Sequence, residues 1–293
     1  MTDDEELINT LGRSKATSSA INNRLSEAET TTAEINDIRE GYRAVAARGS
    51  VIYFVVASLA VVDPMYQYSL QFFKSLVVQR LERTEKKELL QDRLSLLIAD
   101  LTSSIFGNVC RGLFEKDKLL CAYLISVKIG MAAGHVSDSE WLTFIVGGAP
   151  NVSVIEKQPI PEQLHKLGVS ERDWNFAVML EYDQSIPFLG LISDIKYTHT
   201  EEWAFFFTTD TPHSDTLPGT WETKLSSFQR LLLVRVLREE KVAYAMRRYV
   251  GNPDILPFYR YLEPYVLDIN NTFLTFIDAI LTLYYIALIL IHA

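Results

Sequence analysis

The first forty residues place apolar and small side chains at spacings that alternate between four and three. The positions are Leu7, Leu11, Ser14, Ser18, Ile21, Leu25, Ala28, Thr32 and Ile35. This 3.5-residue period predicts a helix that packs along one narrow seam, as in a coiled coil. Several seam positions are small or polar, so we expect weak pairing that permits sliding. A solvated helix lying on the body of the protein fits the same periodicity.

A second pattern follows the segment 39–50, where the seam spacing ends. An apolar run at 51–62 leads to Asp63 and Pro64, which predict the cap and the first position of a new helix. Four large apolar side chains then recur at helical spacing. They are Met65, Tyr68, Phe72 and Leu76. We expect this face to lie in the core rather than to form a binding surface.

Residues 85–134 read as helix throughout, and Gly134 is placed to end that helix. One apolar stripe runs along its first half. It consists of Leu90, Leu94, Leu97, Leu101, Ile105 and Val109. The sequence SDSE at 137–140 is a capping-box pattern that opens a short helix, which Gly147 would close.

The second half of the chain begins with a predicted linker at 148–161, which is rich in turn-forming residues. Between 185 and 212, the runs IPFLGLI and WAFFFTTDTP are bounded by turn residues, and either fits a strand. Residues 223–251 return to helix, with two helices meeting near Arg238. We therefore expect a mainly α fold: a coiled-coil arm plus a helical bundle, with a partial α/β segment near 185–212.

Composition narrows the possible partners. The chain has 293 residues, 48% of them hydrophobic, which is enough for a sizeable core. The formal net charge is -9 and the sequence pI is about 5.2. A protein that binds nucleic acid needs a concentrated basic face to neutralise the phosphates, so this excess of acidic residues argues against a nucleic-acid partner.

The two cysteines, Cys110 and Cys121, fall within the predicted continuous helix. Eleven residues of helix would separate them by roughly 16 Å, too far for a disulfide. Free thiols suit a reducing cytosol. The acidic N-terminus MTDDEELINTL does not resemble a signal or transit peptide.

The C-terminal segment 273–293 is long and apolar enough to reach across a bilayer as a helix. Asp278 would cost about 3 kcal/mol near the midplane, which disfavours a membrane span. A helical interaction protein anchored in a membrane by this tail remains the alternative from another functional class. A third alternative is a free scaffold that pairs through the seam.

The motifs of common chemistries are missing. No glycine-rich loop with GK[ST] occurs, and GRSKATS at 12–18 sits inside the heptad helix, where the backbone amides are already bonded. The five histidines show no paired metal-ligand spacing, and no nucleophile motif is present. The sequence therefore predicts no catalytic, cofactor-binding or metal residue.

Charged residues outside the seam are candidates for contacts with a neighbouring domain. They are Arg111, Glu115 and Lys116 in RGLFEKDKLL, together with Arg238. The alternative for the first three is a helix–turn–helix junction in which Glu115, Lys116 and Asp117 are solvated. An exposed helical arginine is also usually only solvated.

Four long blocks resemble dynein heavy chains, in the same order. The first starts at DDEELINTL and runs to LQFF, and the others are NVCRGLFEKDKLLCAYLI, SEWLTFIVGG and SSFQRLLLVRVLREEKVAYAMRRYVG. The resemblance covers roughly residues 3–251 and is closest to axonemal types. It departs from the family at Ala44 and Glu239, where proline is common, and we expect it to end after Gly251.

The resemblance implies four segments. Residues 1–45 would form an arm of the strut, or buttress, which braces the stalk. Residues 46–150 would form the helical small part of the fifth AAA+ module. Residues 151–251 would be a connector and the start of the sixth module, and 252–293 would be a non-family apolar tail, such as retained intron sequence.

The same resemblance implies a mechanical function. In the family, ATP is hydrolysed chiefly in the first module, and the microtubule is bound at the stalk tip. ATP and Mg would therefore belong to the parent motor, with no cofactor in this segment. The strut would relay ring motion into the register of the stalk helices. Its seam residues would be Leu7, Leu11, Ile21, Leu25 and Ile35.

The implied partners are the stalk and AAA+ ring of the same heavy chain. Intermediate chains, light chains and microtubules would be reached only through that parent. The implied location is the cytoplasm and cytoskeleton, in the axoneme of a cilium or flagellum.

Overall fold

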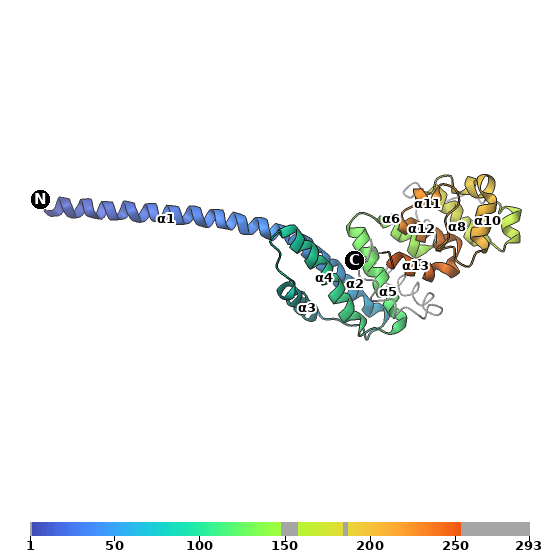
Figure 1. The fold of residues 1–293 in the computed structure, drawn as a ribbon, viewed down its shortest axis with the longest axis horizontal. Helices are drawn as coiled ribbons and strands as arrows, with labels where there is room; N and C mark the ends of the chain where they lie inside the picture. Colours follow the sequence, from blue (N-terminus) through green and yellow to red (C-terminus); the bar gives the residue numbers. More distant parts are fainter. Residues whose placement is uncertain (1, 148–157, 184–186, 253–293) are drawn as a thin grey trace, which may run out of the picture.

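A computed structural model describes residues 2–147, 158–183 and 187–252 (Figure 1). These residues form helices joined by short connections, with no strand among them, which confirms the mainly α prediction. A long helix, α1, projects from a body made of two helical units. The helices of the first part are α1 (Thr2–Gly41), α2 (Arg43–Val62), α3 (Leu70–Arg83), α4 (Leu90–Cys110), α5 (Glu115–Ala132) and α6 (Asp138–Val146).

The second unit contains shorter helices, one π-helix and one 3-10 helix. They are α7 (Glu162–Lys166), α8 (Glu171–Tyr182), α9 (Leu191–Ser193), η1 (Asp194–Thr198), α10 (Thr200–Thr208), α11 (Trp221–Lys224), α12 (Ser227–Leu237), η2 (Glu239–Lys241) and α13 (Val242–Val250). We call α2–α6 the first unit and α7–α13 the second unit. The two meet where α13 packs on α5 and α12 packs on α6.

The helical backbone continues from α1 into α2. The Tyr42 amide bonds the Ile38 carbonyl at 3.2 Å, and the Ala46 amide bonds the Tyr42 carbonyl at 3.1 Å. The seam spacing ends at 39–50, but the helix continues through this segment. Since i to i−4 bonds cross the junction, α1 is a direct extension of a core helix.

The core of the first unit forms where α2 packs against α4 and α5. The stripe predicted on α4 is confirmed: from Leu94 to Val109 its members are buried, and Leu90 is half-buried. On α2, Ile52 and Leu59 are fully buried at 0% exposure. Burying a side chain of this size contributes about 2 kcal/mol, so these stripes stabilise the unit.

The predicted helix start at Asp63 is wrong. Asp63 is instead the C-cap of α2, and Ser69 caps α3 by accepting the Phe72 amide. The intervening turn shifts which side chains reach the core: Tyr66 is 2% exposed, whereas Met65 is 74% exposed. On α3 the buried side chain is Phe73 rather than its predicted neighbour. An Asp-Pro pair occurs after the end of a helix as well as at its start. The sequence pattern alone could not distinguish these two positions.

The continuous helix predicted for 85–134 is also wrong, because α4 stops at Cys110 and a turn precedes α5. The Gly112 amide closes that turn on the Val109 carbonyl at 2.9 Å. Cys110 and Cys121 therefore lie on two different helices. The separation expected along one continuous helix, and the exclusion of a disulfide that rested on it, therefore do not apply. Both cysteines are free thiols in this structure.

The predicted helix ends near residue 140 are confirmed. Gly134 follows α5 with φ 76°, and Gly147 follows α6 with φ 78°, the left-handed region that glycine occupies readily. At the start of α6, Ser137 accepts the Glu140 amide, and the Glu140 carboxylate accepts the Ser137 amide. This is the capping box that SDSE predicted.

The partial α/β segment predicted near 185–212 is wrong for the described residues 187–212, which form α9, η1 and α10. The Glu181 carboxylate accepts the amides of Gly190 at 3.2 Å and Ile192 at 2.7 Å, which starts α9. On α10, Trp203 and Phe207 are buried at i and i+4, while Phe205 is 61% exposed. The aromatic run therefore follows helical rather than strand periodicity.

One stretch of the described residues could cross a membrane by length and composition alone. It lies in the continuous helix Ile8–Val62 and has a mean hydropathy of 2.0. A buried core helix passes the same test, and the α2 part of this helix packs against α4 and α5. The predicted tail anchor at 273–293 lies outside the described residues.

Candidate functional site: the arm and its supports

The arm α1 exposes its apolar seam to solvent. Leu11 is 62% exposed, Ile21 is 59%, Leu25 is 56% and Ile35 is 58%. The side chain of Leu7 is not among those described. A helix of this kind without a partner leaves apolar surface in water that a second helix would bury.

The base of the arm is fixed against α4. A Cβ atom at Gly41 would lie 3.2 Å from the Leu90 side chain. Glycine at this position therefore lets α1 and α4 pack closely. Next to it, Arg93 Nε donates to the Tyr42 hydroxyl at 3.0 Å, and Arg93 Nη1 donates to the Glu85 carbonyl at 3.4 Å. The point where α1 joins the body is thus held by both packing and hydrogen bonds.

Three of the predicted contact residues lie at the corner between α4 and α5: Arg111 in the connection, and Glu115 and Lys116 in the first turn of α5. Arg111, Glu115 and Lys116 are exposed, and Glu115 pairs with Lys118 at 2.6 Å. The alternative, a helix–turn–helix junction, is confirmed, with Glu115 and Lys116 exposed. Its solvated Asp117 is wrong, because Asp117 is only 5% exposed. The three exposed charges thus lie within six residues of one another at this corner.

Asp117 is buried because it has a partner from a distant turn. The Tyr66 hydroxyl donates to Asp117 Oδ2 at 2.6 Å and accepts the Phe114 amide at 3.1 Å. Burial, followed by the hydrogen bond to Asp117, raises the pKa of Tyr66. This pair links the end of α2 to the start of α5, and the sequence offered no signal for it.

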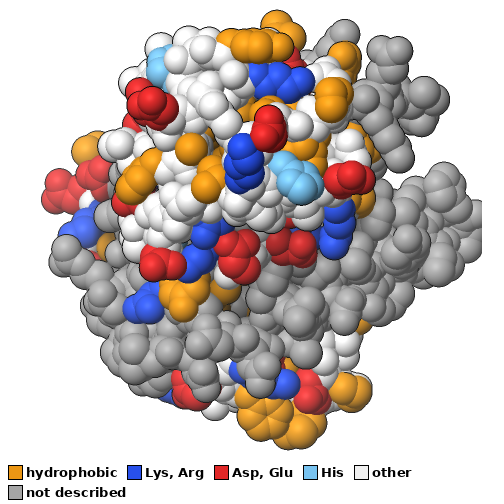
Figure 2. All heavy atoms as spheres, turned by 90° about the vertical axis from the view of Figure 1, so that its right-hand side faces the viewer, with side chains coloured by type: hydrophobic (Ala, Val, Ile, Leu, Met, Phe, Trp, Pro, Cys, Tyr) orange, Lys and Arg blue, Asp and Glu red, His pale blue; other side chains and the backbone are white. Residues whose placement is uncertain are grey.

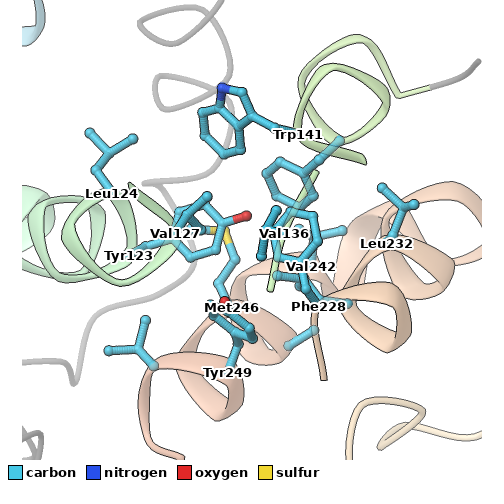
Figure 3. Packing of buried hydrophobic residues seen from close by; sticks show 14 of the residues in the cluster. Tyr123, Leu124, Val127, Val136, Trp141, Phe228, Leu232, Val242, Met246 and Tyr249 are labelled. Atoms are coloured by element: carbon cyan, nitrogen blue, oxygen red, sulfur yellow. The ribbon is translucent and has the colours of Figure 1, made fainter. Parts of the chain in front are cut away.

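Four aromatic rings form the junction between the two units (Figure 3). Tyr123 of α5 lies 5.4 Å from Phe144 of α6 and 6.0 Å from Tyr249 of α13, measured between ring centroids. Phe228 of α12 closes the set at 6.0 Å from Phe144 and 5.6 Å from Tyr249. Figure 3 shows Met246 of α13 directed into the same cluster. Such edge and tilted ring pairs each contribute about 1 kcal/mol beyond burial, so the units are joined by a hydrophobic interface.

A buried arginine crosses the same junction. Arg235 of α12 is 4% exposed; its Nε donates to the Phe144 carbonyl at 3.2 Å, and its Nη1 lies 2.9 Å from Glu239. The carbonyl belongs to the last turn of α6, where the helix dipole favours a cation. Gly147 leaves room for the guanidinium, since a Cβ there would lie 2.9 Å from Nη2.

Arg238, predicted as a contact with a neighbouring domain, binds within its own unit. Its Nη1 and Nη2 donate to the carbonyls of Phe206 at 2.8 Å and Thr209 at 2.9 Å. Its Nε donates to Glu240 at 2.5 Å. The guanidinium thus links η2 to the end of α10. Arg238 therefore belongs to the second unit, whereas Arg111 belongs to the first.

A carboxylate at the start of η1 organises the second unit. Asp194 Oδ2 accepts the indole N–H groups of Trp203 at 2.8 Å and Trp221 at 2.9 Å, and Oδ1 lies 2.7 Å from His199 Nδ1. Burial raises the pKa of Asp194, but these three donors outweigh it and hold the pKa below its usual value. The hydrogen bond to Asp194 raises the pKa of His199.

The charged surface of the second unit is mixed. Figure 2 shows basic and acidic side chains interleaved on the face at the end opposite the arm. Among the described residues, no group of three or more His, Cys, Asp or Glu side chains is arranged to hold a metal ion. The features with a definite geometry in the described residues are an exposed arm, a fixed base and a bonded junction between units.

Sequence reasoning missed Asp194, Asp117 and Arg235. Each is a charged residue whose partners lie on other elements, so no local spacing marks it. The capping box that starts α12, with Ser226 and Gln229, was also missed, although the order Ser-x-x-Gln is a readable signal.

The chain is similar to axonemal dynein heavy chains. It is 36% identical over 271 residues to dynein axonemal heavy chain 1 of Homo sapiens and 37% identical over 275 residues to dynein axonemal heavy chain 6 of the same species. It is 34% identical over 270 residues to the dynein-1-beta heavy chain, flagellar inner arm I1 complex, of Chlamydomonas reinhardtii. These matches cover 92%, 85% and 92% of this chain and 6% of each relative. No protein-family model matches the chain.

The similarity to the relatives extends beyond Gly251, where we expected it to end. A match over 92% of the chain is longer than the part that ends at Gly251, so it takes in some of the segment 252–293. The division into four segments stays a prediction. With this identity over most of its length, the chain belongs to the dynein heavy chain family and corresponds to a short segment of those relatives.

Proposed function

We propose that this chain relays conformational change between the AAA+ ring and the stalk of a microtubule motor in the axoneme of a cilium or flagellum. The observation that carries the proposal is α1: forty residues of helix whose described side chains are exposed and whose seam is apolar. At 1.5 Å per residue it extends about 60 Å. A helix of that length that exposes a seam is suited to pairing with another helix of the same heavy chain.

The supports of the arm fit a relay. Continuous backbone bonds join α1 to α2, and α2 is packed by α4 and α5. A change in the first unit would therefore alter the direction of α1 rather than be absorbed by a flexible joint. The small and polar seam positions, such as Ser14 and Ser18, would weaken pairing enough for two registers to interconvert.

The test uses the full-length motor with Leu11→Asp and Leu25→Asp together. Both side chains are exposed here, so the body should fold unchanged, while a charge in the seam should disrupt pairing. We expect stimulation of ATP hydrolysis by microtubules to fall about tenfold, with basal hydrolysis nearly unchanged.

The matched control is Ser19→Asp with Ser26→Asp. These serines are exposed on the side of α1 away from the seam, and they add the same charge. The control should keep the stimulation. Equal loss in both variants, or no loss in either, would show that the seam does not transmit the signal.

A further inference from the structure

The second unit contains an open cavity of about 390 Å³, bounded by α12, α13 and the segment that leads into α12. Cavities of this size hold small organic ligands. One part of the lining is apolar and includes Leu231, Val234 and Tyr249. The polar side chains of the lining include His213, Glu222, Ser226, Ser227, Arg230 and Arg248.

Two arginines from different helices meet at this cavity. Arg230 of α12 donates through Nη2 to the Asp215 carbonyl, and Arg248 of α13 donates through Nη1 to the Ser214 carbonyl at 3.1 Å. Because the two accepting carbonyls are consecutive in the chain, the two guanidinium groups lie close together. Like charges at such a distance repel each other, so a bound anion would stabilise this arrangement.

The carboxylates near the cavity leave Arg248 without a charged partner in the described part of the chain. Glu222 accepts a hydrogen bond from Arg230 Nη1 and so offsets the first arginine. The Asp215 carboxylate accepts two threonine hydroxyls. Arg248 is exposed, and its printed hydrogen bond uses one of the several N–H donors of a guanidinium. The remaining donors are available to a ligand.

Two further features make the cavity wall attractive to an anion. Helix α12 begins there, with Ser226 as its N-cap and Ser227 as its first residue, and a helix N-terminus carries partial positive charge. His213 also lines the cavity, and its Nδ1 has no hydrogen-bond partner among the described residues. Burial, followed by the positive charge of Arg248, lowers the pKa of His213.

We propose that this cavity binds the phosphate group of a small anion, which is either free phosphate or a phosphate monoester. Arg248 would donate charge-assisted hydrogen bonds to the phosphate oxygens, a geometry for which guanidinium groups are well suited. The N-terminus of α12 would add its dipole. The side chains of Leu231 and Val234 would contact the organic part of a monoester.

The position of the cavity would couple the ligand to the junction between the two units. Tyr249 lines the cavity, and its ring also packs against Tyr123 of α5 at 6.0 Å between centroids. A ligand held beside Tyr249 would therefore stabilise α13 where it contacts the first unit.

Isothermal titration calorimetry of the 293-residue chain with inorganic phosphate and with phenyl phosphate, at constant ionic strength, tests the proposal. We expect Arg248→Gln to weaken binding of the anion at least about tenfold, because the variant loses charge-assisted hydrogen bonds. Tighter binding of phenyl phosphate would assign the site to a monoester, and equal affinities would assign it to free phosphate. Failure of the wild-type chain to bind either anion would overturn the proposal, as would unchanged affinity in Arg248→Gln.

The matched control is Arg247→Gln. Arg247 is the neighbouring residue of α13 and carries the same charge, but it is not part of the cavity lining. This variant should bind both anions as the wild-type chain does, and circular dichroism should show that both variants are folded. An equal loss of affinity in the two variants would mean that net charge rather than the cavity attracts the anion, which would also overturn the proposal.

Discussion

At the scale of single residues, the Tyr66 hydroxyl bonds two groups, one of which is the buried Asp117 carboxylate. It donates to Asp117 and accepts the Phe114 amide. Tyr66→Phe should therefore lower the free energy of unfolding by about 2 kcal/mol, because a carboxylate and an amide lose their shared partner. Urea denaturation followed by circular dichroism measures the change.

Tyr68→Phe is the matched control. Tyr68 is half-buried, and its hydroxyl donates to one carbonyl, that of Val109. This substitution should cost less than about 1 kcal/mol. Equal costs for the two variants would mean that the Asp117 contact contributes nothing specific.

A second residue-scale prediction concerns pH. The carboxylate of Asp194 raises the pKa of His199 above its ordinary value of 6.5. The stabilisation from protonated His199 is therefore fully present below pH 6.5 and is lost as pH rises through the raised pKa. The unfolding free energy of the wild-type chain should exceed that of His199→Gln at low pH, and the two should converge at high pH.

The control for this measurement is His135→Gln, which changes an exposed histidine away from Asp194. It should track the wild-type chain at every pH. A wild-type advantage over His199→Gln that does not vary with pH would show that the Asp194 contact does not depend on protonation of the ring.

At the scale of elements, two helix ends with the same backbone conformation have different surroundings. Gly147 and Gly134 have φ of 78° and 76°. A Cβ at Gly147 would lie 2.9 Å from Arg235 Nη2, whereas Gly134 has open space around it. Gly134→Ala should cost about 1 kcal/mol from backbone strain, and Gly147→Ala should cost about 1 kcal/mol more by displacing Arg235.

Thermal or urea unfolding of both variants checks this difference. Similar costs would imply that the guanidinium moves aside freely. A larger loss of unfolding free energy for Gly147→Ala than for Gly134→Ala would show that Arg235, which links α6 and α12, contributes the difference.

The same scale shows what sequence patterns could predict. Capping at Ser137 and the stripe from Leu94 to Val109 depend on neighbours within one helix, so periodicity and caps revealed them. The turn at 111–114 was expected only as an alternative, because the helical pattern is apolar on both sides of it. The strands expected in 185–212 failed for a related reason: short aromatic runs fit a buried helix as well as a strand.

At the scale of the whole molecule, the sequence predicted the seam of α1 but not how the rest of the chain packs around its base. Residues Leu11 and Leu25 gave the period, and the structure shows both exposed. The junction between units rests on Tyr123, Phe228 and Tyr249, which come from three separate helices. Contacts between residues more than a hundred positions apart leave no local pattern, so the sequence alone could not predict that the two units would be joined there.

The continuity of α1 with α2 has a geometric consequence. A rigid rod about 60 Å long moves its tip by about 1 Å for each degree that its base tilts. A tilt of about 5° near Tyr42 would carry the far end through roughly the pitch of one helical turn. A side-chain rearrangement around Leu90 would be enough to produce such a tilt. The tip of α1 would then move by about the distance between successive turns of an opposing helix.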